Sequence, residues 1–381
     1  MNPITLLQPP RIVFGNGCAV QSVEFLVQRG VKRVLLVTSK SVRPQIDFLT
    51  DALQQANVTV VEAGFIPAEP TLEFFNSVLQ AVQSARIDSV LAVGGGSVID
   101  VAKLVAALAY GDQGAAQVFG INLVNGRELP LVCLPTTAGT GAEVSPNSIL
   151  LDEANELKKG VVSPHLVPDA AFVDPLLTVT VPPAVTAATG LDALTHCLEA
   201  YANKFAHPIV DNYAVQGMKL ISGNLLRAIR DGGDLEARAA LALGSLYGGL
   251  CLGPVNTAAV HALAYPLGGR YRIAHGVANA LLLPHVCRYN FSAAPERYAE
   301  IATALGVERN GSALTTAEHG VEWLTRLSRD CGVPQKLSEL NIPHHAITPM
   351  AQAAMQVTRL LKNNLRALTA ADAAQIYTSA Y

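Results

Sequence analysis

One carboxylate and one imidazole stand at a spacing that suits a metal site. Asp192 and His196 are four residues apart in the run Leu191–Cys197. On a helix this spacing places both side chains on one face, roughly 6 Å apart, which is close enough to bind one cation. By itself, the pair is also explained by an ordinary hydrogen bond between aspartate and histidine.

Two further histidines favour the metal. His261 and His275 lie in and just after Ala239–Gly269, a segment without Asp, Glu, Lys or Arg that we expect in the core. An unsatisfied buried polar group costs about 1–3 kcal/mol, and a metal ion would satisfy both imidazoles. Three imidazoles and one carboxylate suit Fe²⁺, Zn²⁺, Co²⁺ or Ni²⁺ and leave a position for a substrate oxygen, whereas Mg²⁺ and Ca²⁺ prefer oxygen ligands. The sequence therefore predicts a metal site at Asp192, His196, His261 and His275.

Two loops have the composition of phosphate-binding loops. The run GGGSVID at 94–100 follows a predicted strand and opens a predicted helix, so its glycines and free N–H groups suit a dinucleotide diphosphate. The run PTTAGTGAEV at 135–144 follows the next strand and offers threonine hydroxyls for phosphate or ribose oxygens. Doubly wound sheets bind ligands at such strand ends. A tight turn without ligand, and a hydroxyl-capped turn, remain the alternatives for the two loops.

The elements that must position these residues change character near residue 180. Short β-branched runs at 34–37, 58–61, 89–93, 131–134 and 170–173 alternate with helical patterns at 42–56, 72–85 and 98–109. This alternation predicts a doubly wound parallel sheet. After Val181-Pro182-Pro183 the pattern is helical to the C-terminus. We therefore predict a dinucleotide-binding α/β domain at 1–180 and an all-helical metal-binding domain at 181–381.

Composition excludes several classes of partner. The formal charge of −3 on 381 residues comes without long charge runs, so we expect no nucleic-acid or membrane partner. Six separated cysteines without a C-x-x-C pair indicate reduced thiols, and the first residues do not resemble a signal peptide, so we expect a cytoplasmic protein. Glycines and prolines interrupt Ala239–Gly269, which favours a buried helical hairpin over a membrane span.

Together, GGGSVID, PTTAGTGAEV, GLDALTHCLEAY and HALAYPLGGRYRIAHGVANALLLPHV resemble the iron-containing alcohol dehydrogenases, which include lactaldehyde reductase and butanol dehydrogenases. The resemblance implies a Rossmann-like domain, a helical metal-binding domain and hydride transfer between NAD(P)(H) and a small alcohol or aldehyde. It implies a homodimer or larger homo-oligomer, and a divalent metal, Fe²⁺ in first place and Zn²⁺, Ni²⁺ or Mn²⁺ as alternatives. By this resemblance the metal ligands are Asp192, His196, His261 and His275, and the residues that contact NAD or NADP are Gly95, Gly96, Ser97, Thr136, Thr137, Thr140 and Lys158.

Two of the departures from the family pattern concern the proton relay and the choice of cofactor. Tyr265 stands where relatives resembling lactaldehyde reductase have a histidine that relays the alcohol proton, so a catalytic tyrosine hydroxyl and a packing role are both open. Ser39 stands where relatives that prefer NAD have an aspartate that repels the 2′-phosphate of NADP. The absence of this aspartate, with Lys40 and Arg43 nearby, predicts that NADP(H) is tolerated.

Two rival functions are consistent with the same motifs. One is a metal-independent reductase of the maleylacetate reductase type, although all four ligand positions are intact here. The other is a non-catalytic protein that binds metal and nucleotide. Structural metal sites are usually closed by four tightly held ligands, often cysteines, which disfavours the second rival.

Overall fold

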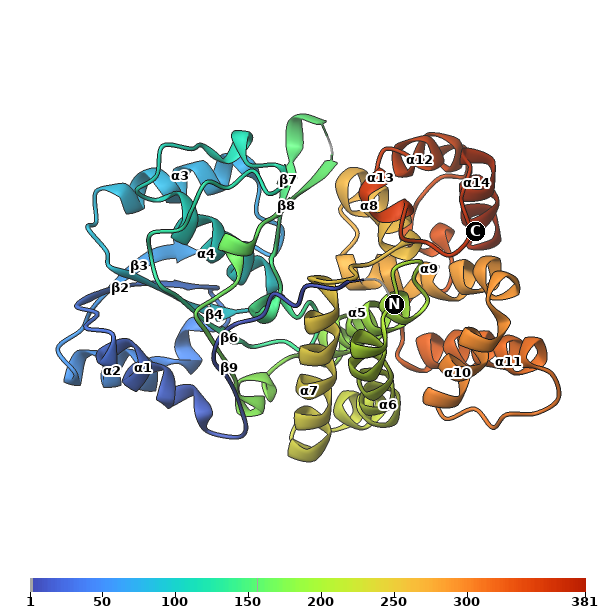
Figure 1. Ribbon diagram of the computed structural model, residues 1–381, viewed down its shortest axis with the longest axis horizontal. Helices are drawn as coiled ribbons and strands as arrows, with labels where there is room; N and C mark the ends of the chain where they lie inside the picture. The colour runs from blue at the N-terminus through green and yellow to red at the C-terminus, as the bar shows by residue number, and fades with distance from the viewer. Residues whose placement is uncertain (1–2, 156) are drawn as a thin grey trace. The chain divides into compact units, whose positions relative to one another are not determined.

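The computed structural model describes residues 3–155 and 157–381 (Figure 1). They form two compact units. An α/β unit contains Leu6–Thr137 and Gly141–Thr180, and a helical unit contains Val181–Tyr381, Ala138–Thr140 and the described residues up to Thr5. From the sequence we assign residues 1–180 to cofactor binding and residues 181–381 to metal binding. This assignment of roles stays a prediction.

The α/β unit is built on a parallel sheet with the strand order β1-β9-β6-β4-β2-β3. Its strands are β1 (Ile12–Phe14), β2 (Arg33–Thr38), β3 (Thr59–Phe65), β4 (Ser89–Gly94), β6 (Leu131–Pro135) and β9 (Ala170–Val173). The chain runs outward from β2 to β3 and then returns to the other side of β2 as β4. The carboxyl ends of β2 and β4 are therefore the point where strand order reverses, and open α/β sheets bind their ligands there.

Helices cover both faces of this sheet (Figure 1). α1 (Gln21–Gln28) and α2 (Asp47–Gln55) pack on one face, and α3 (Leu72–Gln83) and α4 (Gly96–Leu108) pack on the other. Successive side chains of β2 point to opposite faces, so Val34 and Leu36 join the first core and Leu35 and Val37 join the second. Burial of both faces explains the continuous apolar runs of the strands. The predicted doubly wound fold is confirmed.

A second sheet was not predicted by the hydrophobic pattern. β5 (Gly120–Ile121) pairs in parallel with β8 (Leu157–Val162), which pairs in antiparallel fashion with β7 (Asn147–Asp152). β8 is mostly half-buried and carries two lysines, so it lacks the apolar run that marks a buried strand. This sheet positions Lys158, which pairs with Leu151 of β7.

The helical unit is centred on α5, which packs on α6, α7 and α9. A Cβ on Gly190 of α5 would lie 2.4 Å from Leu225 of α6, so the glycine allows these two helices to approach closely. The helices are α5 (Pro183–Tyr201), α6 (Pro208–Arg230), α7 (Leu235–Leu252), α8 (Ala259–Tyr271), α9 (His275–Asn290), α10 (Pro295–Ala304), α11 (Ala313–Asp330), α12 (Ile347–Ala354), α13 (Thr358–Leu361) and α14 (Ala370–Ser379).

The charge-free segment Ala239–Gly269 forms most of α7 and α8. Both helices are largely buried, as predicted. They do not form a hairpin of mutually packed helices, however, because α7 packs mainly on α5 and α6 whereas α8 packs mainly on α9 and α12. Among the described residues, no helix combines the length and the apolar character needed to cross a membrane.

Candidate metal centre and cofactor loops

Three helices of the helical unit carry the four predicted ligands. Asp192 and His196 are buried on one face of α5. His261 lies in the first turn of α8, and His275 is the first residue of α9. Their side chains are held by helix ends and helix packing rather than by loops, which favours fixed positions.

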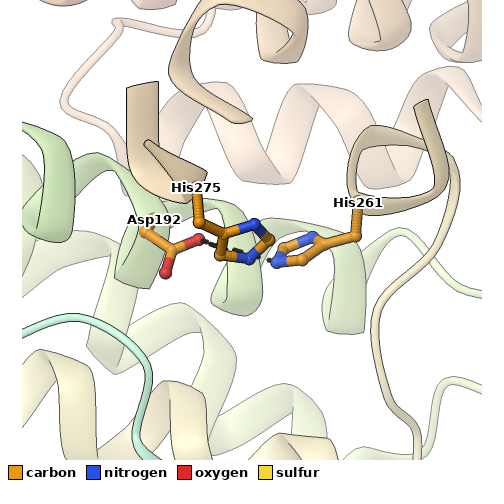
Figure 2. A group of neighbouring side chains, drawn as sticks. All are labelled: Asp192, His261 and His275. Atoms are coloured by element: carbon orange, nitrogen blue, oxygen red, sulfur yellow. Dashed lines mark ion pairs between the residues drawn. The ribbon is translucent and has the colours of Figure 1, made fainter. Parts of the chain in front are cut away.

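The Oδ1 atom of Asp192 is the common neighbour of the three imidazoles. It lies 3.8 Å from Nε2 of His196, 3.6 Å from Nε2 of His261 and 3.8 Å from Nε2 of His275. Figure 2 shows Asp192, His261 and His275 pointing toward one another. One donor atom from each of these three residues lies within 4.8 Å of the others, a spacing that one metal ion can bridge.

His196 is adjacent to this group of three but is not part of it. Its ring stacks on that of His261, with ring centroids 4.8 Å apart and an angle of 19° between the planes. Its Nδ1 atom is buried and has no hydrogen-bond partner among the described residues. The structure therefore places His196 beside the predicted site without bringing it into the same three-residue cluster.

Burial and two carboxylates set the electrostatics of this cluster. Burial alone would raise the pKa of the Asp192 carboxyl, but the neighbouring His196 and His275 outweigh this effect and hold it far below its usual range. Burial lowers the pKa of His196 to about 4. Burial also acts to lower the pKa of His261, but Asp192 and Glu199 outweigh it and raise this pKa to about 9. Buried carboxylates thus draw positive charge to the site.

Asn279 on α9 cannot satisfy all three of its polar neighbours in the cluster at once. Its Nδ2 atom lies 2.7 Å from Oδ1 of Asp192, 3.1 Å from Nε2 of His261 and 3.2 Å from Nε2 of His275. An amide nitrogen has only two hydrogens for these three acceptors. The buried Oδ1 of Asn279 has no partner among the described residues. A divalent cation would satisfy the lone pairs that remain, and one carboxylate with three imidazoles fits such an ion.

Two residues of this cluster were missed by the sequence analysis. Glu199 is buried and accepts a hydrogen bond from Nδ1 of His261 at 2.6 Å, and Asn279 contacts three of the predicted ligands. Helical spacing contained a signal for both, since Glu199 follows His196 by three residues and Asn279 follows His275 by four. Apart from this spacing, nothing in the sequence distinguished these positions from ordinary polar residues.

Tyr265 lies one turn after His261, with its ring centroid 6.4 Å from that of His275. The side chain is buried and also packs with Ala262 and Leu360 in a small apolar cluster. Its position beside the cluster is consistent with both a proton-relaying hydroxyl and a packing side chain.

In the α/β unit, the two predicted phosphate loops lie side by side. The backbone N–H of Thr136 donates to the carbonyl of Gly94 at 3.0 Å, and a Cβ on Gly95 would lie 3.3 Å from Oγ1 of Thr137. Gly95 precedes α4, which begins at Gly96, so the free N–H groups of this helix start at the glycine loop. Thr140 belongs to the helical unit, unlike the other cofactor residues that the resemblance implies.

The segment between β3 and α3 joins the glycine loop to Lys158. Oγ of Ser97 donates to the carbonyl of Ala68, and Nζ of Lys158 pairs with the carboxylate of Glu69 at 2.8 Å. The structure thus brings Ser97 and Lys158 to neighbouring residues of one segment.

Ser39 directly follows β2, at the point where strand order reverses. Lys40 is exposed. The guanidinium of Arg43 is held by two acids, Asp47 at 2.5 Å and Glu62 at 2.8 Å. Lys40 and Arg43 are the two cations near Ser39 that could bind a 2′-phosphate. Arg43 is already paired with two carboxylates in this structure.

Comparison with known proteins gives matches along nearly the whole chain. A family model described as iron-containing alcohol dehydrogenase matches residues 9–175, and one described as the C-terminal part of the Fe-containing alcohol dehydrogenase family matches residues 186–381. The chain is 39% identical to long-chain-alcohol dehydrogenase 1 of Geobacillus thermodenitrificans over 389 residues, which cover 100% of this chain and 98% of the relative. It is 34% identical to lactaldehyde reductase of Escherichia coli, with 97% of each chain covered. The solved structure of NADH-dependent butanol dehydrogenase A of Thermotoga maritima matches with a TM-score of 0.90 and 26% identity, covering 100% of this chain and 99% of that one.

Proposed function

The chain belongs to the iron-containing alcohol dehydrogenase family, and from this membership we propose which of its residues carry out the oxidoreduction of alcohols and aldehydes. The family resemblance, the fold class and the enzyme class predicted from the sequence are confirmed. The enzyme transfers a hydride between a nicotinamide cofactor and an alcohol or aldehyde.

We propose that Asp192, His196, His261 and His275 hold a divalent cation. The observation that carries this proposal is the convergence of three imidazole nitrogens on one carboxylate oxygen, at 3.6–3.8 Å. Beside it, two buried polar atoms, Nδ1 of His196 and Oδ1 of Asn279, have no partner among the described residues. The family name favours Fe²⁺. The same donors also suit Zn²⁺ and Ni²⁺, and Mn²⁺ is kept as a further alternative.

The chemistry at this site follows from charge and access. When bound, the cation polarises the oxygen of the alcohol or aldehyde. Asp192 adds the negative charge that retains the cation. The His275 side chain is 28% exposed, compared with 5% for His196 and His261, so we propose that the substrate approaches on the His275 side. Tyr265 lies on that side, where its Oη would pass on the alcohol proton.

The cofactor site is proposed at the two loops of the α/β unit. NAD(H) would bind through Gly95, Gly96, Ser97, Thr136, Thr137 and Lys158. Support comes from the adjacency of the two loops beside the reversal of strand order, which is the usual place for a dinucleotide. Ser97 and Lys158 would exchange their contacts with Ala68 and Glu69 for contacts with the cofactor.

NADP(H) is proposed to be tolerated as well. Ser39 places no carboxylate where it would repel a 2′-phosphate, and Lys40 is exposed beside it. Because Asp47 and Glu62 neutralise Arg43, we expect tolerance rather than preference. The test is kcat/KM with each cofactor: a preference for NAD(H) above roughly a hundredfold, about 2.7 kcal/mol, refutes the proposal.

The decisive experiment is removal of the metal. Chelation should abolish the reduction of small aldehydes with NADH, and separate reconstitution with Fe²⁺, Zn²⁺, Mn²⁺ or Ni²⁺ should restore it to different extents. Asp192→Ala should lose both metal and turnover. The matched control is His285→Ala, because Nδ1 of His285 contacts Oγ of Ser379 instead of the cluster. Full activity in the metal-free enzyme or in Asp192→Ala would contradict the assignment.

Two further proposals concern the state of the enzyme. We propose that it works in the cytoplasm, where its cysteines stay reduced, and as a homodimer or larger homo-oligomer. Light scattering of the purified protein measures its oligomeric state, and a monomer would contradict the second proposal.

A further inference from the structure

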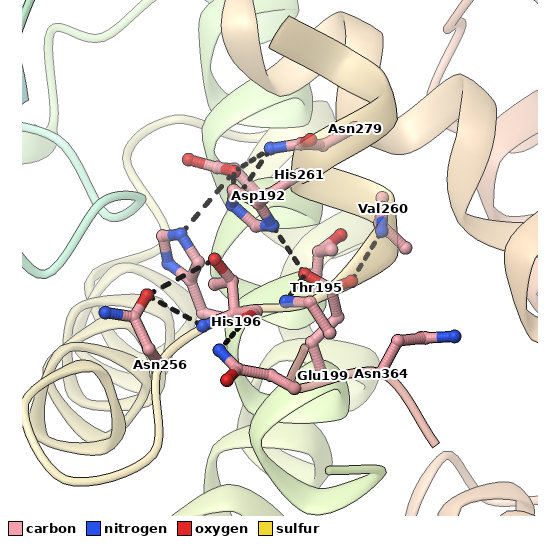
Figure 3. A network of polar contacts seen from close by, with 12 residues as sticks. Asp192, Thr195, His196, Glu199, Asn256, Val260, His261, Asn279 and Asn364 are labelled. Carbon is pink, nitrogen blue, oxygen red and sulfur yellow. Dashed lines mark hydrogen bonds and ion pairs between the residues drawn. The ribbon is translucent and has the colours of Figure 1, made fainter. Parts of the chain in front are cut away.

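Glu199 is a buried carboxylate that the proposed mechanism does not use. It lies on α5, on the same helix face as Asp192 and His196, and only 3% of its surface is exposed. Its two oxygens accept three hydrogen bonds, from Nδ1 of His261 at 2.6 Å and from the backbone N–H groups of Val260 at 2.6 Å and Ala258 at 3.0 Å (Figure 3). All three donors belong to the start of α8.

We propose that Glu199 is a positioning residue for the metal centre, which fixes the tautomer and the orientation of the His261 ring. This inference rests on the proposed function, in which His261 is a metal ligand. An ionised carboxylate can only accept hydrogen bonds, so the short contact requires a proton on Nδ1 of His261. In the neutral imidazole, Nε2 then keeps its lone pair, and Nε2 is the atom that faces Asp192. Imidazoles that bind metals commonly donate their second N–H to a carboxylate in this way.

The backbone contacts of Glu199 fix the place of the ring as well as its proton. α8 begins at Ala259, and no side chain of its own N-cap residue, Ala258, caps it. The N–H groups of Ala258 and Val260 are among those that a helix start leaves without partners. Glu199 supplies the missing acceptor from another helix, and its negative charge is favourable at the positive end of α8. One carboxylate therefore anchors both the imidazole and the backbone that carries it.

Charge balance supports the same role. The cluster contains two buried carboxylates, Asp192 and Glu199, and three imidazoles. With neutral imidazoles, a divalent cation brings the net charge of this buried group to zero. Glu199 would thus retain the cation electrostatically although it does not contact it.

The test compares Glu199→Gln with wild type, using Co²⁺ as the probe. Glutamine keeps the shape but loses the charge and one acceptor oxygen, so Co²⁺ affinity, measured by competition with a chromophoric chelator, should fall about 10- to 100-fold. Long-range ¹H–¹⁵N NMR of the histidine side chains should show a fully protonated Nδ1 of His261 in wild type and a partly protonated Nδ1 in the variant. The matched control is Glu300→Gln, which removes a hydrogen-bonded carboxylate from Tyr201 on the same helix and should leave both readouts unchanged.

The outcomes separate this inference from the proposed function. If wild type binds no Co²⁺, the metal site itself fails, and the role of Glu199 fails with it. If wild type binds Co²⁺ and Glu199→Gln binds it equally well, only the positioning role is overturned, even if the variant is less stable. Should Glu199→Gln fail to fold, the wild-type NMR spectrum decides, because an Nδ1 atom of His261 that carries no proton in the metal-free protein contradicts the inference directly.

Discussion

Gly276 is the position where one added methyl group should most disturb the candidate metal centre. It follows His275 at the start of α9, and a Cβ built on it would lie 2.2 Å from the backbone oxygen of Ala188 on α5. Real Cβ atoms essentially never approach closer than 3.0 Å, so Gly276→Ala must separate the two backbones by at least about 0.8 Å, the difference between these distances. Because Asp192 lies one turn after Ala188, this shift also moves Asp192 away from His275.

Two opposing effects set the size of the change. Alanine gains up to about 1 kcal/mol over glycine within a helix. Overpacking typically costs about 1–3 kcal/mol, and here the clash is with a backbone carbonyl that has no alternative rotamer. The rigid neighbour places this cost at the upper end, about 3 kcal/mol, and with the gain of about 1 kcal/mol subtracted we expect a net loss of about 2 kcal/mol in the free energy of unfolding. A misplacement of about 1 Å at the reacting groups should also lower kcat/KM roughly a hundredfold.

The assay is urea unfolding of the metal-free protein, together with Co²⁺ affinity and kcat/KM for a primary alcohol. The control is Gly223→Ala on α6, where the added Cβ meets nothing within 4 Å. There we expect a gain of about 0.5–1 kcal/mol and unchanged activity. If Gly276→Ala is as stable as wild type and keeps its Co²⁺ affinity and kcat/KM, the close approach of α5 and α9 does not position the ligands and the reasoning is wrong.

Three other predictions address separate parts of the molecule. Burial raises the pKa of the Glu143 carboxyl from 4.5 to about 7, so its contribution to stability is complete below pH 4.5 and is lost as the pH rises through 7. Between pH 4.5 and 8, the unfolding free energy of Glu143→Gln should therefore change less than that of wild type, by on the order of 3 kcal/mol. Urea unfolding at a series of pH values measures this, and the same pH dependence in both proteins refutes it. All six cysteines are buried, and burial raises the pKa of Cys133 and Cys197 to about 12, so the native protein at pH 8 should resist alkylation that reaches all six thiols after unfolding. Mass spectrometry counts the labels, and rapid labelling of the native protein would contradict the packing. Tyr265→Phe should lower kcat by about 10²-fold or more if Oη passes on the proton, whereas an unchanged kcat assigns Tyr265 to packing.

The sequence by itself determined the features that depend on short-range pattern. Alternating apolar runs predicted the doubly wound sheet, and the loss of strand patterns after Val181 predicted the helical half. The spacing of Asp192 and His196 placed both on one face of α5, because helical geometry fixes that relation locally. The four predicted ligands came from residue type and spacing, since few sequences combine such groups in an otherwise apolar setting.

Only the tertiary structure decided which distant groups meet. The partners of Arg43, the contact of Lys158 with Glu69 and the second sheet around β8 depend on residues that are far apart in the chain or have no apolar signal. The same holds for Glu199, whose neighbours on α8 follow it by about sixty residues. The reason is physical: local periodicity specifies which face of an element is buried, but the pairing of polar groups depends on how those faces pack together.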